Sequence, residues 1–183
     1  MAEVFSNSLT RAVGIVTTSS SGAIGITTNL ITGISTVSVT VGDMVDNQHY
    51  IAGSKVSTIG AGQVTIDRDS TNSGSASSQI VSFLGVTNCY TSPTSTKSIL
   101  IGGTFANNTN NSVNLTVELY DSSAVGTANS ASQIASKIPV PAASSFVISD
   151  TGKTLLEGDD VLRVYCDTSN AIDVSLSILT GVN

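Results

Sequence analysis

Two segments near the end of the chain alternate apolar and polar side chains at every second residue. The apolar members are Leu162, Val164 and Cys166 in the first segment, and Val174, Leu176 and Ile178 in the second. A period of two is the repeat of a β-strand with one buried face and one solvent-exposed face. The polar residues 167–170 separate the two segments. The pattern therefore predicts an antiparallel hairpin at the core of the C-terminal half.

The remaining sequence predicts an all-β fold. Apolar residues make up 40% of the chain and charged residues 11%, a mixture unlike that of a disordered chain and suited to β-branched strands. No stretch repeats apolar residues at the spacing of a helix face. Further strands are expected at 36–41, 64–66, 80–83, 98–103 and 113–120. Residues 36–41 alternate without a break and form the clearest predicted strand of the N-terminal half.

The composition divides the chain near residues 85–95, which end in a Ser/Thr/Pro turn mixture at 91–95. Stretches of this kind commonly connect domains. We therefore expect an N-terminal arm over 1–18 that becomes ordered against a neighbour. A small β domain is expected over 19–85, and an antiparallel, jelly-roll-like β-sandwich domain over 86–183.

One weak internal repeat links the two halves. Gly42-Asp43 and Gly158-Asp159 each stand just before a predicted strand. Aspartate side chains stabilise turns by accepting hydrogen bonds from nearby backbone groups. This turn chemistry explains both sites without a duplication.

The charge pattern argues against nucleic acid and membrane as partners. The net charge is −6, and the seven basic residues are scattered, whereas nucleic-acid binding needs a basic patch. No window approaches the roughly 18 apolar residues of a membrane span. The first nine residues do not resemble a signal peptide, so we expect synthesis in a cytoplasm. A surface this poor in charge favours contact with protein, so we expect a homo-oligomer or a subunit of a larger assembly.

The two cysteines, Cys89 and Cys166, are too few for a disulfide framework. Cys166 alternates with Leu162 and Val164, which favours a small buried apolar side chain. A disulfide between Cys89 and Cys166 is the alternative.

No residue pattern indicates a known catalytic or metal-binding motif. Residues 67–72 superficially resemble a calcium loop, but the glycine of the sixth place is missing and Ser78 stands where the bidentate glutamate belongs. The pair Asp159-Asp160 is interpreted as turn chemistry. His49 is the only histidine, and no Gly-x-Ser-x-Gly elbow surrounds a serine. We therefore predict no catalytic, cofactor-binding or metal-binding residue, no cofactor and no enzymatic activity.

Two regions carry motifs of a known group of proteins. Glu157-Gly158-Asp159 and Asn170-Ala171-Ile172-Asp173-Val174 stand within residues 87–179, which resemble a C-terminal β-sandwich module of tailed-phage virion proteins, marine cyanophages among them. The glycine turns and β-branched strands of residues 31–83 are similar to a small β module of phage tail and fibre proteins.

The resemblance implies a structural role and lends no catalytic residue. The expected function is a subunit of a tailed-bacteriophage virion, either a capsid decoration or cement protein or an accessory protein of the neck or tail. Its partners would be other virion proteins, and its location the virion, after synthesis in the host cytoplasm. The alternative is an adhesin of the fibre or baseplate that binds host-surface carbohydrate.

Overall fold

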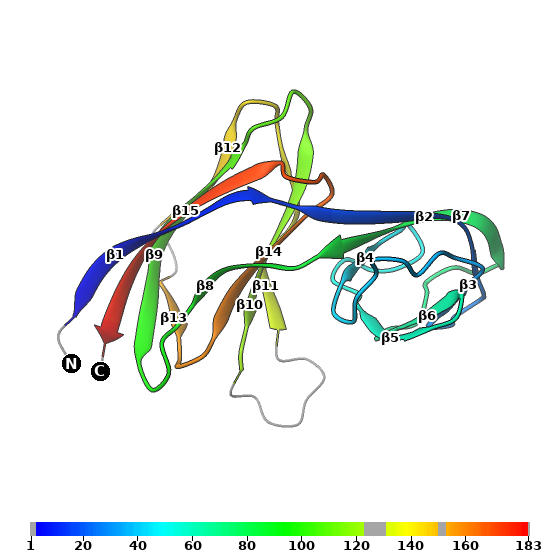
Figure 1. Cartoon of the computed structure of the whole chain (residues 1–183), viewed down its shortest axis with the longest axis horizontal. Helices are drawn as coiled ribbons and strands as arrows, with labels where there is room; N and C mark the ends of the chain where they lie inside the picture. Colours follow the sequence, from blue (N-terminus) through cyan, green and yellow to red (C-terminus); the bar gives the residue numbers. More distant parts are fainter. Residues whose placement is uncertain (1–2, 123–130, 150–152, 183) are drawn as a thin grey trace. The chain divides into compact units, whose positions relative to one another are not determined.

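The computed structural model describes residues 3–122, 131–149 and 153–182. Within these ranges every helix or strand element is a β-strand, which confirms the all-β prediction. The chain divides into two compact units (Figure 1). The first unit contains Met1–Gly14 and Thr87–Asn183, and the second contains Ile15–Val86. No helix that could span a membrane occurs in the part of the chain that the structure describes.

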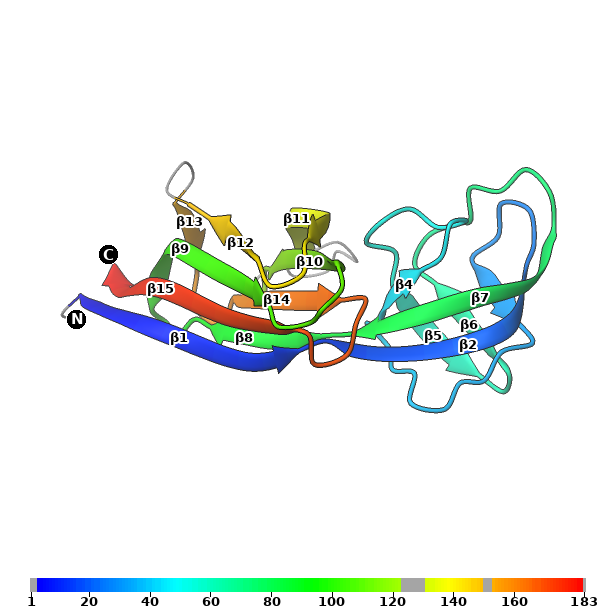
Figure 2. The same ribbon diagram turned by 90° about the horizontal axis from the view of Figure 1, so that it is seen from above.

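The first unit is a β-sandwich of two antiparallel sheets, whose strands can be followed in Figures 1 and 2. The five-stranded sheet has the order β1-β15-β9-β12, and β13 also pairs with β9. Its strands are β1 (Val4–Val13), β9 (Lys97–Asn107), β12 (Ser145–Ile148), β13 (Thr154–Leu156) and β15 (Ile172–Val182). The four-stranded sheet has the order β11-β10-β14-β8. Its strands are β8 (Thr87–Thr91), β10 (Val113–Tyr120), β11 (Ala131–Val140) and β14 (Val161–Cys166).

The sandwich core contains side chains from both sheets. On β15 the large buried side chains are Ile172, Val174, Leu176 and Ile178, the last three as the alternation predicts. They pack in one cluster with residues of the four-stranded sheet, among them Leu115, Val117, Val164 and Cys166. Apolar burial of this kind is the main stabilising contribution to a fold.

The predicted hairpin of β14 and β15 is wrong, because the two strands belong to different sheets. The turn between them crosses from one sheet to the other. Asp167 attaches the turn to the four-stranded sheet, since its carboxylate accepts hydrogen bonds from Asn114 N at 2.9 Å and Asn114 Nδ2 at 2.7 Å. The polar segment 107–111 likewise connects β9 to β10 across the sandwich, although its composition is typical of a hairpin loop.

The expected N-terminal arm is also corrected. Val4–Val13 forms β1, which pairs antiparallel with β15 from Val4 opposite Thr180 to Val13 opposite Ile172. Val13 is fully buried in the core. Ser8 Oγ donates a hydrogen bond to the carbonyl oxygen of Cys89 at 2.9 Å, which ties β1 to β8 of the opposite sheet. The segment therefore finds its neighbour within its own chain.

The second unit is a six-stranded antiparallel sheet with the order β4-β7-β2-β3-β6-β5. Its strands are β2 (Ile15–Ile24), β3 (Leu30–Thr32), β4 (Met44–Asp46), β5 (Val56–Gly60), β6 (Gln63–Ile66) and β7 (Ala76–Gly85). Its own core gathers buried side chains such as Ile24, Ile31, Tyr50, Val64 and Phe83. Two separate cores account for the division into two units.

The predicted strand over 36–41 is wrong, because this segment is a loop with two turns. Ser38 has a φ of 64°, which lies outside the β region of a regular strand. Val37 is 75% exposed and Val41 64% exposed, while Val39 alone enters the core. The alternation is real, but no neighbouring strand pairs with it.

The expected junction near 85–95 is largely ordered structure. Val86 ends the second unit, and Thr87 starts β8 of the first. The turn mixture that follows is held by Ser92, whose hydroxyl donates to Thr96 O at 3.0 Å within the buried interior.

Candidate functional site

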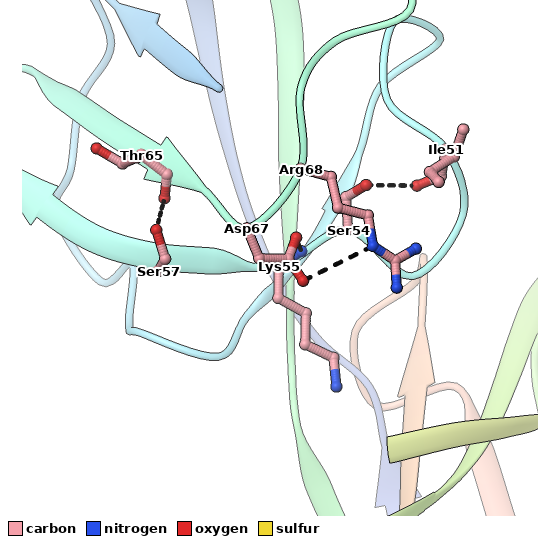
Figure 3. A network of polar contacts seen from close by, with 7 residues as sticks. All are labelled: Ile51, Ser54, Lys55, Ser57, Thr65, Asp67 and Arg68. Atoms are coloured by element: carbon pink, nitrogen blue, oxygen red, sulfur yellow. Dashed lines mark hydrogen bonds and ion pairs between the residues drawn. The ribbon is translucent and has the colours of Figure 1, made fainter. Parts of the chain in front are cut away.

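The polar segment 67–72, which superficially resembles a calcium loop in sequence, begins within the second unit's backbone scaffold (Figure 3). Asp67 Oδ1 accepts a hydrogen bond from Lys55 N at 2.8 Å, and Asp67 N donates to Lys55 O at 2.8 Å. Arg68 Nε lies 4.0 Å from Asp67 Oδ2. The carboxylate thus joins the end of β6 to the start of β5. Among the described residues no group of three or more His, Cys, Asp or Glu side chains could hold a metal ion.

Asp159 and Asp160 have different structural roles. The buried Asp160 accepts hydrogen bonds from Glu157 N at 2.8 Å and from Ser122 N at 3.1 Å. The exposed Asp159 accepts one from Thr94 Oγ1 at 2.7 Å. Both act on turns around β14.

His49 is a loop residue of the second unit. Its backbone N donates to Asn47 Oδ1 at 2.9 Å, and its carbonyl oxygen accepts from Thr71 N at 2.8 Å. Its ring Nε2 lies 3.4 Å from Gln48 Nε2. These contacts stabilise the loop.

Both cysteines are buried free thiols. The interpretation of Cys166 as a small buried apolar side chain is confirmed, since it is 0% exposed within the sandwich core. Burial raises the pKa of the Cys89 thiol and of the Cys166 thiol to about 11. A thiol with so high a pKa holds its proton at neutral pH and is a poor nucleophile.

The four-stranded sheet carries a cluster of polar and aromatic side chains that the sequence pattern did not predict. Glu118 and Arg163 lie directly opposite each other on β10 and β14. Tyr165 Oη donates a hydrogen bond to Glu118 Oε1 at 3.4 Å. The Arg163 guanidinium lies 3.5 Å from the ring centroid of Tyr120, a cation–π contact. Burial above all, and then the Glu118 carboxylate, raise the pKa of Tyr165.

The sequence does not reveal this cluster, because alternation over 113–119 places Glu118 on the strand face opposite the apolar residues Val113, Leu115, Val117 and Leu119. In the structure Glu118 is 2% exposed and Tyr165 is 1% exposed. A buried carboxylate requires charged or hydrogen-bonding neighbours. The cross-strand partner that supplies them can be identified only once the register of β10 and β14 is known.

An apolar surface feature of the first unit lies on its five-stranded sheet. The side of this sheet that points away from the sandwich core is called the outer face below. One row of directly opposed residues on it runs across four neighbouring strands: Phe5 of β1, Leu179 of β15, Ile99 of β9 and Leu155 of β13. Phe5 is 62% exposed and Leu155 is 46% exposed, while Leu179 and Ile99 are half-buried. Four large apolar side chains therefore form one continuous line on the surface.

A second row crosses the outer face farther along the strands. It contains Leu9, Ser175, Thr104 and Val147, each directly opposite the next. Leu9 is 72% exposed and Val147 is 54% exposed. This row is apolar at both edges of the sheet and polar in its middle. Contiguous exposed apolar surface is a mark of interaction sites on soluble proteins.

The connection between β9 and β10 borders a surface depression of about 470 Å³. The side chain of Asn107 forms hydrogen bonds within the fold there. Its Nδ2 donates to Asn111 O and Val140 O, and its Oδ1 accepts from Thr109 N. The other lining side chains are those of Ala106, Asn108, Asn110, Ala143, Ser144 and Ser145. The depression is thus lined by short side chains, both polar and apolar.

Comparison of the chain with protein-family models, with curated proteins and with solved structures gave no match.

Proposed function

We propose that this chain is a non-enzymatic structural subunit of a tailed-bacteriophage virion. Its role is that of a capsid decoration or cement protein, or of an accessory protein of the neck or tail, and it acts through protein–protein packing. Its location is the virion, and its partners are other virion proteins and further copies of itself.

The observation that carries this proposal is the outer face. An apolar row that crosses four strands on the solvent side costs free energy in a lone molecule, because about 25 cal/mol is forfeited for every Å² of apolar surface left in water. The same row stabilises a complex once a partner covers it. The assignment of that partner to a virion follows from the sequence resemblance of residues 31–83 and 87–179.

The polar residues that were considered as catalytic or metal-binding groups support a structural role for the chain. Asp67 and Asp160 accept backbone hydrogen bonds that hold turns. Cys89 and Cys166 are buried in the sandwich core. Each of these side chains has a role in maintaining the fold. The alternative of an adhesin that binds host-surface carbohydrate stays a prediction from the sequence.

The test is to locate the chain in purified particles. Mass spectrometry of density-purified virions from the source of this sequence should detect the chain in a copy number set by the symmetry of the head, neck or tail. Antibody labelling in electron micrographs should then place it at one of these positions. A chain found only in the soluble fraction of the lysate would contradict the proposal.

A further inference from the structure

We infer that the outer face is the contact surface for a second copy of this chain, packed face to face about a two-fold axis that runs parallel to the strands. This inference rests on the proposed function, because it names a partner for the packing surface described there. It is carried by the order of the side chains in the two rows, by the charge of the face and by its size.

The two rows match themselves under this symmetry. A two-fold axis parallel to the strands, and midway across the sheet, brings the β1 edge of one copy over the β12 and β13 edge of the other. Phe5 of one copy then lies opposite Leu155 of the other. In the second row Leu9 of one copy lies opposite Val147 of the other. The exposed apolar side chains at the two ends of each row thus meet apolar side chains of the other copy.

The middle of the face is compatible with the same packing. Ser175 and Thr104 occupy the centre of the second row, and small hydroxyl side chains allow two sheets to approach closely. Leu179 and Ile99 occupy the centre of the first row. Aligned sheets pack about 10 Å apart with interdigitating side chains, so the central apolar pair of each copy would be covered by that of the other.

The charge of the face favours a copy of the same chain over a partner of opposite charge. Arg11 Nε lies 3.9 Å from Asp173 Oδ2, and Lys97 Nζ lies 3.7 Å from Glu157 Oε1. Each pair is neutral, although the whole chain carries a net charge of −6. A strongly charged face would repel its own copy, because like charges brought together across an interface are unfavourable. The two neutral pairs bring no such penalty.

The size of the face is sufficient for a dimer. Strands lie about 4.8 Å apart and rise about 3.3 Å per residue, so four strands abreast over about ten residues cover roughly 500 Å². Two copies would bury about 1,000 Å² in total, which reaches the size at which specific interfaces begin. A dimer of moderate affinity is therefore expected.

Chemical crosslinking tests the arrangement directly. The double variant Phe5→Cys/Leu155→Cys, treated with a short bismaleimide, should give a covalent dimer on denaturing gels. Within one copy the two positions lie three strand spacings apart, about 14 Å, and an internal crosslink would not change the mass of the band. Each single variant should form dimer at least about tenfold more slowly, because Phe5 and Leu155 face each other and not themselves under this symmetry. Equal rates for the double and single variants would overturn the inference.

Measurement of mass in solution provides the second test. The wild-type chain should be dimeric by light scattering at tens of micromolar. Phe5→Glu/Leu155→Glu should raise the dissociation constant by roughly 100-fold or more, since each dimer would bury four carboxylates. The matched control is Ile80→Glu on β7 of the second unit, where Ile80 is 67% exposed, and it should leave the dimer intact. An equal effect of the control would overturn the inference.

The failure of this inference can be distinguished from the failure of the proposed function. A wild-type chain that stays monomeric in solution but is recovered in particles would overturn self-association and leave the structural role standing. A dimer that crosslinks as described but is absent from particles would support the inference and contradict the virion role.

Discussion

Gly14 lies so close to Thr168 that a Cβ atom on Gly14 would overlap the carbonyl oxygen of Thr168. Gly14 stands between β1 and β2 with a φ of 122°, a conformation that side chains rarely adopt. Its carbonyl oxygen accepts a hydrogen bond from Asn170 N at 3.0 Å. The end of β1 is therefore held against the turn between β14 and β15 by a contact that only glycine permits.

Replacing Gly14 should destabilise the first unit strongly. Gly14→Ala adds both backbone strain and an overlap with main-chain atoms, for an expected loss of about 2–4 kcal/mol in the free energy of unfolding. The control is Gly42→Ala, because Gly42 also has a positive φ, 94°, but nothing lies within 4 Å of its added Cβ. It should cost about 1 kcal/mol. Urea unfolding measures both, and equal losses would show that the contact with Thr168 relaxes freely.

Deletion of β1 should unfold or greatly weaken the sandwich. Residues 4–13 supply a ladder to β15, the fully buried Val13 and the hydrogen bond from Ser8 to Cys89. A chain that lacks residues 1–13 should lose several kcal/mol of stability in the first unit, since it also exposes the β15 edge. The second unit has its own core and should keep its stability. Hydrogen exchange resolved by peptide measures both units, and unchanged protection of β15 would contradict the prediction.

Alternation in the sequence identified strands and buried faces, but not their neighbours. The inward residues of β15 could be recognised because Val174, Leu176 and Ile178 repeat with a period of two. The same pattern fits a hairpin or a crossing between two sheets, so the pairing of β14 and β15 could not be recognised. Pairing depends on contacts made across the sandwich, which local periodicity does not contain.

The role of β1 was hidden for a related reason. Its inward side chains include Ser8 and Thr10, which are polar, and its partner residues on β15 lie 159 to 176 positions away in the chain. The outer face could not be predicted either. Phe5, Ile99 and Leu155 become one row only through the register of separate strand pairs.

The buried thiols should make the sandwich lose stability at alkaline pH. Burial raises the pKa of Cys89 and of Cys166 from 9.0 to about 11. Between these values the unfolded chain releases thiol protons that the folded chain retains, so stability is fully present below about pH 9 and falls as the pH rises toward 11. Burial, followed by Asp69, also raises the pKa of Tyr50 from 10.0 to about 12, which extends the effect in the second unit.

Urea unfolding under reducing conditions at pH 7, 9 and 10.5 measures this loss. The variant Cys89→Ala/Cys166→Ala should show a smaller fall in stability over the same range, whatever its stability at pH 7. In the native wild-type chain both thiols should also react with a disulfide reagent only as fast as the protein opens. Rapid native labelling, or an unchanged pH dependence in the double variant, would contradict the assigned burial.

Asp43 and Asp160 perform the same task in the two units. Asp43 Oδ2 accepts a hydrogen bond from Thr40 N at 2.8 Å, and Asp160 Oδ2 accepts one from Glu157 N at 2.8 Å, in both cases three residues earlier. Each aspartate is 4% exposed and is followed directly by a strand. The weak repeat seen in the sequence is therefore a shared turn design, although Asp160 rather than Asp159 is the equivalent of Asp43.

Replacement of Asp160 should be costly for the sandwich, because two backbone donors depend on it. Asp160→Ala would leave Glu157 N and Ser122 N without their acceptor, for an expected loss of about 1–3 kcal/mol. Asp160→Asn keeps one carbonyl oxygen and should lose about half as much, since only one of the two bonds survives. The control is Asp159→Ala, whose exposed bond to Thr94 is worth under about 1 kcal/mol. Urea unfolding ranks the three variants, and a loss for Asp159→Ala as large as that for Asp160→Ala would show that the buried carboxylate does not hold the turn.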